Sequence, residues 1–227
     1  MKAHLVAYTL IDHEMFNDLD YVPHYKSING STDFVSNADE LAEFAGRACY
    51  ESWDRPNPAT ATNEGYLKHI IEVGHFSVLE HASATFYLTG VSRSFTHELV
   101  RHRHMSFSQL SQRYVDESTA PAIFPPNGDG IEKLMIANHQ IRTQQLYTEL
   151  VSRRLTQGQT RKQAREAGRA VLPNATETRI VVTGNMRSWR ELLGKRIGPG
   201  VDAAFNENAQ EILRQLKELA PNTFQDM

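Results

Sequence analysis

The sequence contains little cysteine: Cys49 is the only one among 227 residues, so no disulfide can form within the chain. A reducing compartment is the simplest setting for such a chain, and we expect a cytoplasmic protein. Long apolar runs are missing as well, because the first apolar stretch is soon broken by Asp12, His13 and Glu14. We therefore expect neither a signal peptide nor a membrane span.

An excess of positive charge is also missing. Lysine and arginine number 24 against 27 aspartate and glutamate residues, which gives a formal net charge of −3. Long-range attraction to nucleic acid or to an anionic membrane is therefore not expected, and any cationic site must come from arginines placed close together. Hydrophobic residues make up 40% of the chain and charged residues 22%, an ordinary globular balance for one compact domain or two small ones.

Several motifs with a known chemistry are absent from the sequence. There is no GxGxxG and no Walker A motif to support a Rossmann domain or a P-loop, and no GxSxG motif to support a serine nucleophile. Five histidines crowd into one region, but no HExxH motif accompanies them, nor any cysteine or carboxylate at ligand spacing. We expect no metal site, and a metal-dependent phosphohydrolase stays an alternative that would use His75, His81, His97, His102 and His104.

Hydrophobic periodicity and turn residues predict a mixture of strands and helices. Strands are expected over residues 3–10, 81–88 and 178–182, and loops over residues 17–36, 53–60 and 121–130. The two element types alternate without a regular βαβ order, which favours an α+β fold over a doubly wound sheet. Helices are expected after Ser36 or Asn37 and over residues 63–73, 91–102, 131–156, 160–172, 187–196 and 203–220.

Two of these helices carry more specific expectations. Cys49 in the first should pack as an inert thiol beside a buried apolar face made of Leu41, Phe44, Ala45 and Ala48. In the helix over residues 91–102, residues four apart form an apolar face and a basic face. Stacked like charges cost a few tenths of a kcal/mol each, which hints at an anionic ligand. The two faces consist of Val91, Phe95 and Leu99 and of Arg93, His97 and Arg101.

Residues 101–114, RHRHMSFSQLSQRY, combine basic side chains with hydroxyl groups. Guanidinium groups grip phosphate bidentately, and hydroxyls and main-chain amides supply further donors. This mixture indicates a phosphate-binding or pyrophosphate-binding site. A solvated basic face near a helix C-terminus explains the composition equally well, because cations are favoured there in any case.

More cations follow in the third quarter of the chain. Arg165 and Arg169 lie four apart on the helix that begins with the capping-box pair Thr160 and Gln163. Three further arginines follow the strand over residues 178–182. They are Arg187, Arg190 and Arg196. The composition alone does not distinguish a ligand site from surface arginines that pair with Glu166 and Glu191.

The run Arg101-His102-Arg103, followed after seven residues by Ser111 and then by Gln112-Arg113-Tyr114, resembles the signature of the flavin-dependent thymidylate synthases, the ThyX family. Other blocks resemble this family in the same order. They are GHFSVLEH (74–81), GVSRSFTHELVRHRH (90–104), AVLPNATETR (170–179) and TGNMRSW (183–189). The resemblance covers most of residues 65–196 and implies a single domain over residues 1–227.

The resemblance implies a methyltransferase of nucleotide biosynthesis that is a flavoprotein. A methylene group would pass from methylenetetrahydrofolate to carbon 5 of dUMP, reduced FAD would supply the hydride that completes the methyl group of dTMP, and NADPH would re-reduce the FAD. The family is a homotetramer that shares its active sites between subunits. Its fold is α+β, with a mixed or antiparallel sheet flanked by helices and no Rossmann domain.

The resemblance also implies roles for individual residues. Arg196 would act in catalysis, facing the uracil and favouring ionisation at N3. The FAD would contact His75, Ser77, Arg101, His102, Arg103, Gln109, Asn185, Met186, Arg187 and Glu191. The dUMP would contact Glu98, Leu99, Val100, Arg101, Gln109, Leu110, Ser111, Gln112, Arg113, Arg169 and Arg196.

One stretch departs from the family pattern. The family usually has a histidine four residues after the position of Arg196, and this chain has Gly200 there, within RIGPGVDAA. The change removes one expected contact at the flavin edge and bears on the placement of Arg196. A second alternative is a non-enzymatic RNA-binding or nucleotide-binding module that uses residues 101–114, although the acidic net charge and the lack of an aromatic-interleaved basic stripe argue against it.

Overall fold

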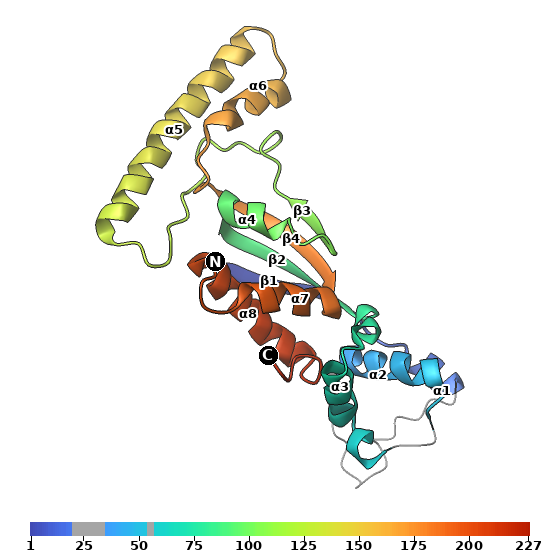
Figure 1. Ribbon diagram of the computed structural model, residues 1–227. Helices are drawn as coiled ribbons and strands as arrows, with labels where there is room; N and C mark the ends of the chain where they lie inside the picture. The colour runs from blue at the N-terminus through green and yellow to red at the C-terminus, as the bar shows by residue number, and fades with distance from the viewer. Residues whose placement is uncertain (20–34, 54–56) are drawn as a thin grey trace. The chain divides into compact units, whose positions relative to one another are not determined.

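The computed structural model describes residues 1–19, 35–53 and 57–227 (Figure 1). The predicted loop over residues 17–36 lies largely outside these ranges, and its first two residues belong to a short helix that was not predicted, α1 (His13–Asp18). The described chain divides into two compact units. Unit 1 comprises residues 1–4, 87–182 and 200–208, and unit 2 comprises residues 5–86, 183–199 and 209–227.

Four strands form one sheet in the order β1-β2-β4-β3. They are β1 (Lys2–Tyr8), β2 (Ser83–Ser92), β3 (Met105–Gln109) and β4 (Glu177–Asn185). Strands β2 and β4 run antiparallel: the hydroxyl oxygens of Thr85 and Thr183 are 2.9 Å apart, and further along β2 the Gly90 amide donates to the Glu177 carboxylate. Together with the helices, this antiparallel sheet confirms the α+β class (Figure 1).

The junction between β2 and the following helix differs from its prediction. Strand β2 continues to Ser92, and α4 spans only Arg93–Leu99. The reason is local, because the Ser92 hydroxyl accepts a hydrogen bond from the Phe95 amide and so caps α4 at that point. Val91 is therefore a buried strand residue, and Arg101 lies beyond the helix, so the predicted stack of Arg93, His97 and Arg101 on one helix face was wrong. Strand β3 was not predicted.

Within unit 1, α5 (Gly130–Thr156) and α6 (Arg161–Gly168) pack against each other. The approach is close at Gly168, where a Cβ would lie 2.7 Å from the Val151 side chain and 2.9 Å from the Tyr147 ring. The predicted capping box of Thr160 and Gln163 is confirmed at the start of α6. It fixes where α6 begins, and therefore which of its residues face the rest of unit 1.

Unit 2 contains α2 (Asn37–Tyr50), α3 (Asn63–Glu72) and α7 (Met186–Arg196). Trp189 of α7 is fully buried, contacts the Phe86 ring edge-on and donates to the Ala84 carbonyl at 3.1 Å. The last long helix, α8 (Ala203–Leu219), has residues in both units. Among the described residues, no helix is long and apolar enough to cross a membrane.

The buried face of α2 was predicted wrongly. Leu41, Phe44 and Ala45 are only partly buried, Ala48 is exposed, and the exposed Cys49 thiol does not pack in the core. The buried positions of α2 are Ala38, Asp39, Glu40, Ala42, Glu43, Gly46 and Arg47, so four of the seven carry a charged side chain. Burial raises the pKa of Asp39, whose carboxylate accepts hydrogen bonds from Thr223 and Asn222. Arg47 pairs with Glu43 at 2.6 Å.

We predict that Gly46→Ala lowers the stability of the protein by about 1–3 kcal/mol. A Cβ at position 46 would overlap the Tyr66 hydroxyl of α3, and the overpacking outweighs the helix propensity that alanine adds. Urea unfolding followed by circular dichroism measures the change. Gly194→Ala in α7 is the matched control, because a Cβ there meets nothing within 4 Å; it should be neutral or stabilising, and an equal loss in both variants would contradict the packing argument.

Candidate active site

Residues 101–104 form a turn directly after α4. The Arg101 amide donates to the Glu98 carbonyl and the His102 amide to the Leu99 carbonyl, both at 3.2 Å. Strand β3 follows, and the chain turns again at residues 112–114 after the Leu110 amide donates to the Arg179 carbonyl at 2.9 Å. Arg101, His102 and Arg103 therefore lie before one five-residue strand in unit 1, and Ser111 and Arg113 lie after it.

The arginines of the predicted site differ in their partners. Arg101 and Arg103 are exposed, and neither forms an ion pair with a carboxylate in the part of the chain that the structure describes. Arg113 instead pairs with Glu166 at 3.0 Å. Exposed ion pairs contribute only about 0–1 kcal/mol, so a phosphate that accepts a bidentate bond can displace such a carboxylate.

One face of α6 holds residues 113–116. The Arg165 guanidinium donates to the Tyr114 carbonyl at 2.6 Å and to the Asp116 carboxylate at 3.1 Å, while Glu166 pairs with Arg113. The Lys162 ammonium lies 5.0 Å from the centre of the Tyr114 ring, and hydrogen bonding to Lys162 lowers the pKa of Tyr114. Glu166 therefore pairs with an arginine of the 101–114 segment, and not with one of the third-quarter arginines considered in the sequence.

A buried carboxylate lies behind this segment. Glu117 is 2% exposed, and its Oε1 atom has no hydrogen-bond partner among the described residues. Burial raises the pKa of Glu117, and the positive charge of Arg93 opposes the shift. Burial likewise lowers the pKa of Arg93, and the nearby charge of Arg169 lowers it further. The charges of Arg93, Glu117 and Arg169 therefore act on one another. Sequence analysis named Arg93 only as part of a basic helix face and did not name Glu117.

Some predicted contact residues can offer a ligand only their main chain. Leu99 and Met186 are each 1% exposed, so their side chains belong to the core. Gln112 is also buried, at 8% exposure, whereas Glu98, Val100, Ser111 and Arg169 are exposed. Leu110 is partly buried and already uses its amide in the sheet.

The remaining predicted FAD residues lie in unit 2, at the start of α7 and in the turn before β2. Asn185 caps α7, because its Oδ1 atom accepts from the Ser188 amide at 2.9 Å and from the Ser188 hydroxyl at 2.8 Å. Arg187 pairs with Glu80 at 2.5 Å, which links α7 to the 3-10 helix (Phe76–Glu80) that carries Ser77. His75 and Ser77 are both exposed.

Two other charged residues of α7 complete this set in unit 2. Glu191 pairs with Lys195 of its own helix at 2.5 Å. This i,i+4 pair is exposed and contributes little to stability. Arg196 is the last residue of α7 and is partly buried.

The backbone after Arg196 explains why the departure from the family pattern is not a simple side-chain change. Gly198 and Gly200 have φ angles of 137° and 83°, in the region that favours glycine. A histidine at position 200 would pay about 1–2 kcal/mol to adopt this left-handed conformation. The glycine and the local chain path therefore go together, and the path would have to change to accommodate a histidine.

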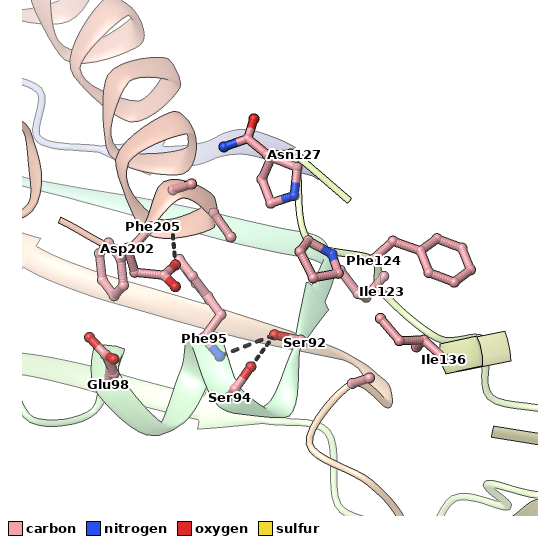
Figure 2. Close-up of a pocket in the computed structure, with 15 residues that line it drawn as sticks. Ser92, Ser94, Phe95, Glu98, Ile123, Phe124, Asn127, Ile136, Asp202 and Phe205 are labelled. Atoms are coloured by element: carbon pink, nitrogen blue, oxygen red, sulfur yellow. Dashed lines mark hydrogen bonds between the residues drawn. The ribbon is translucent and has the colours of Figure 1, made fainter. Parts of the chain in front are cut away.

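A pocket of about 270 Å³ lies in unit 1 between the start of α4, the loop before α5 and the start of α8 (Figure 2). Phe95, Phe124 and Phe205 provide apolar walls, and the Asp202 carboxylate accepts a hydrogen bond from the Phe205 amide at 2.9 Å. Glu98 is the one predicted site residue in the lining. With two carboxylates and no cation in its lining, the pocket repels phosphate.

The histidines do not form a metal site in the part of the chain that the structure describes. No group of three or more histidine, cysteine, aspartate or glutamate side chains there could hold a metal ion. His102 instead lies near the Phe205 ring, with ring centroids 6.4 Å apart.

The fold and these side chains define an α+β protein with an exposed cationic segment suited to phosphate, and comparison with known proteins is more specific. Residues 32–222 match the family model described as thymidylate synthase complementing protein. The chain is 54% identical over 205 residues to a protein of Mycobacterium avium named flavin-dependent thymidylate synthase, covering 86% of this chain and 82% of that protein.

Two further relatives carry the same name. The Mycolicibacterium vanbaalenii protein is 56% identical over 205 residues, covering 86% of this chain and 82% of that protein. The Mycobacteroides abscessus protein is 48% identical over 227 residues, covering 91% of each. The chain belongs to this family, the flavin-dependent thymidylate synthases, as the motif resemblance predicted.

We predict that Arg165→Met loosens residues 114–120 while the rest of the fold stays intact. The variant loses the charged hydrogen bonds to the Tyr114 carbonyl and to Asp116, and hydrogen bonds to charged groups contribute about 1.5–3 kcal/mol. Hydrogen exchange measured by mass spectrometry should show at least about tenfold faster exchange in this segment.

Arg214→Met is the matched control for this experiment. Arg214 also forms ion pairs, but with Glu211 and Glu218 on its own helix, α8. Its loss should leave exchange at residues 114–120 unchanged. Equal exchange there in the wild type and in Arg165→Met would show that α6 does not hold the segment.

Proposed function

We propose that this chain catalyses the reductive methylation of dUMP to dTMP. Methylenetetrahydrofolate donates the carbon, and FAD, which NADPH reduces, supplies the hydride that completes the methyl group. The observation that carries the proposal is the pair of exposed guanidinium groups, Arg101 and Arg103, which have no carboxylate partner among the described residues. An acidic chain that keeps two such cations exposed is suited to an anionic ligand at this turn.

The residues of the FAD site fit the chemistry of that cofactor. Its pyrophosphate needs fixed cations and hydrogen-bond donors, and the turn over residues 101–103 supplies guanidinium and imidazole groups. Ser77 and Arg187 would add a hydroxyl and a guanidinium, once Arg187 releases Glu80. The remaining members of the proposed FAD site are His75, Gln109, Asn185, Met186 and Glu191, with Met186 contributing its main chain only.

The dUMP site would use the other end of β3. Ser111 and Arg113 offer a hydroxyl and a guanidinium to the phosphate, and Arg169 supplies a second guanidinium. Glu166 holds Arg113 in place before the nucleotide binds, and the phosphate displaces it. The main chain or side chains of Glu98, Leu99, Val100, Arg101, Gln109, Leu110, Gln112 and Arg196 complete the proposed site.

Arg196 would act on the uracil ring. A guanidinium stays protonated at any working pH, so it can stabilise negative charge as that charge develops on the ring. Its position at the end of α7, where the chain turns into Gly198, leaves its side chain partly exposed. This role requires no nucleophile from the chain. Accordingly, no contact among the described residues places an arginine at the thiol of the exposed Cys49.

The assembly is also part of the proposal. We propose a cytoplasmic homotetramer of single-domain chains, without a Rossmann domain, whose active sites are shared between subunits. Helix α5 supports an assembly, because only Gln140 and Tyr147 of its 27 residues are fully buried. The exposed apolar residues of α5 include Ile131, Leu134, Met135, Ile141 and Leu146. This apolar surface is larger than an isolated subunit would leave in water, and another copy would cover it.

The first test is spectroscopic and chemical. The purified protein should bind FAD, show flavin absorbance and release FAD when it is denatured. With NADPH, methylenetetrahydrofolate and dUMP, it should form dTMP. A protein that binds no FAD and makes no dTMP, yet shows chelator-sensitive phosphatase activity or salt-dependent RNA binding, would contradict the proposal and favour one of the two alternatives.

We predict that Arg196→Ala lowers the rate of dTMP formation at least about 100-fold while FAD stays bound. The reason is that one preorganised charge stabilises the transition state by about 2.7–4 kcal/mol. Arg196→Lys should retain part of the activity. Arg154→Ala on the exposed surface of α5 is the control and should be fully active. Normal turnover by Arg196→Ala would remove Arg196 from the mechanism.

A further inference from the structure

The side-chain amide of Gln109, the last residue of β3, is held from behind by two threonines. Its Nε2 atom donates to the Thr96 hydroxyl oxygen at 2.8 Å and to the Thr178 hydroxyl oxygen at 3.4 Å. Thr96 lies in α4 and Thr178 in β4, and they are 2% and 1% exposed. Both amide protons therefore face buried hydroxyl groups of the same unit.

The hydrogen bonds fix which way round the amide lies. The Thr96 hydroxyl has one proton and donates it to the Arg93 carbonyl at 3.0 Å. Its oxygen can therefore only accept from Gln109. If the amide were rotated by half a turn, Oε1 would face an oxygen without a proton to give, and a buried pair of acceptors is disfavoured.

The carbonyl oxygen, Oε1, is then the atom that Gln109 has left to offer. The side chain is partly exposed, and no donor to Oε1 is found among the residues that the structure describes. We infer that Thr96 and Thr178 are positioning residues that present Gln109 to the bound ligand as a hydrogen-bond acceptor. Position 109 therefore selects a ligand group that carries a proton.

This inference rests on the proposed function, in which Gln109 lies near both dUMP and FAD. Either ligand has suitable donors. The nucleotide carries a ribose 3′-hydroxyl and the N3–H of the uracil, and the flavin carries an N3–H and ribityl hydroxyls. The shared chemistry is an O–H or N–H group aimed at a fixed carbonyl oxygen, and the two sources are separated by measuring the two ligands independently.

The experiment compares Thr96→Val with Thr96→Ser in the FAD-loaded protein. Valine keeps the shape but removes the acceptor, so the amide can turn and Oε1 is no longer fixed. We expect the KM for dUMP or the Kd for FAD to rise about tenfold, which corresponds to the loss of one hydrogen bond. The change in kcat should be small. Thr96→Ser keeps the hydroxyl and should stay within about twofold of the wild type.

Thr85→Val is the matched control. Thr85 also shares a hydrogen bond with a threonine hydroxyl across β2 and β4, that of Thr183 in unit 2, but it lies outside the proposed site. It should change neither constant. Thermal unfolding of each variant identifies any loss of fold, and Thr178→Val serves as the second variant if Thr96→Val does not fold.

A double-mutant cycle tests the mechanism. In the Gln109→Leu background, Thr96→Val should weaken binding no further, because there is no amide left to orient. Dideoxy-UMP lacks the 3′-hydroxyl. If wild type and Thr96→Val bind it equally, the 3′-hydroxyl is the nucleotide group that donates to Gln109.

The outcomes separate the inference from the proposed function. If the wild-type protein makes dTMP and Thr96→Val matches it in both constants, the positioning role is wrong while the proposed function stands. Equal losses from Thr96→Val in the wild-type and Gln109→Leu backgrounds would likewise overturn it, since the threonine would then act without Gln109. If the wild type binds neither FAD nor dUMP, the proposed function itself fails.

Discussion

The bonds from Arg165 to the Tyr114 carbonyl and to Asp116 are the interaction on which the candidate site depends. Residues 111–120 have no regular secondary structure, so the sheet cannot position them. A guanidinium on a capped helix can, because its planar fork binds two acceptors at once. The same helix carries Glu166, which holds Arg113, so the start of α6 at Thr160 sets the geometry of the segment that follows β3.

In the proposed sites, carboxylates hold two of the arginines that would bind ligand anions. Glu166 holds Arg113 and Glu80 holds Arg187, and both pairs are exposed. Such pairs keep flexible side chains near their working positions while costing a ligand little to break. Arg101 and Arg103 have no such partner among the described residues, so the acidic composition of the chain conceals a strongly cationic turn. Net charge therefore says little about a local site.

The sequence was sufficient wherever the signal was local. The capping box of Thr160 and Gln163, the helix that begins after Ser36 and the long helix before Gln157 were all predicted, because caps and periodicity depend on neighbouring residues. The motif at residues 101–114 identified the family. Its geometry was not predictable: β3 is too short to show a pattern, and the partners of Gln109 come from α4 and β4. The charged buried face of α2 was not predicted for the same reason, because the hydrogen-bond partner of Asp39 is Thr223, which is far away in sequence.

The positive φ angles at Gly198 and Gly200 have a consequence for inhibitor selectivity. The family resemblance implies an imidazole at the position of Gly200 in other members, and a compound that stacks on that ring would find bare main chain here. The reverse also holds. Without a side chain at this corner, the chain leaves room for a bulkier substituent than a histidine-bearing relative would admit. A compound that filled this space would discriminate between members of one family through a missing side chain.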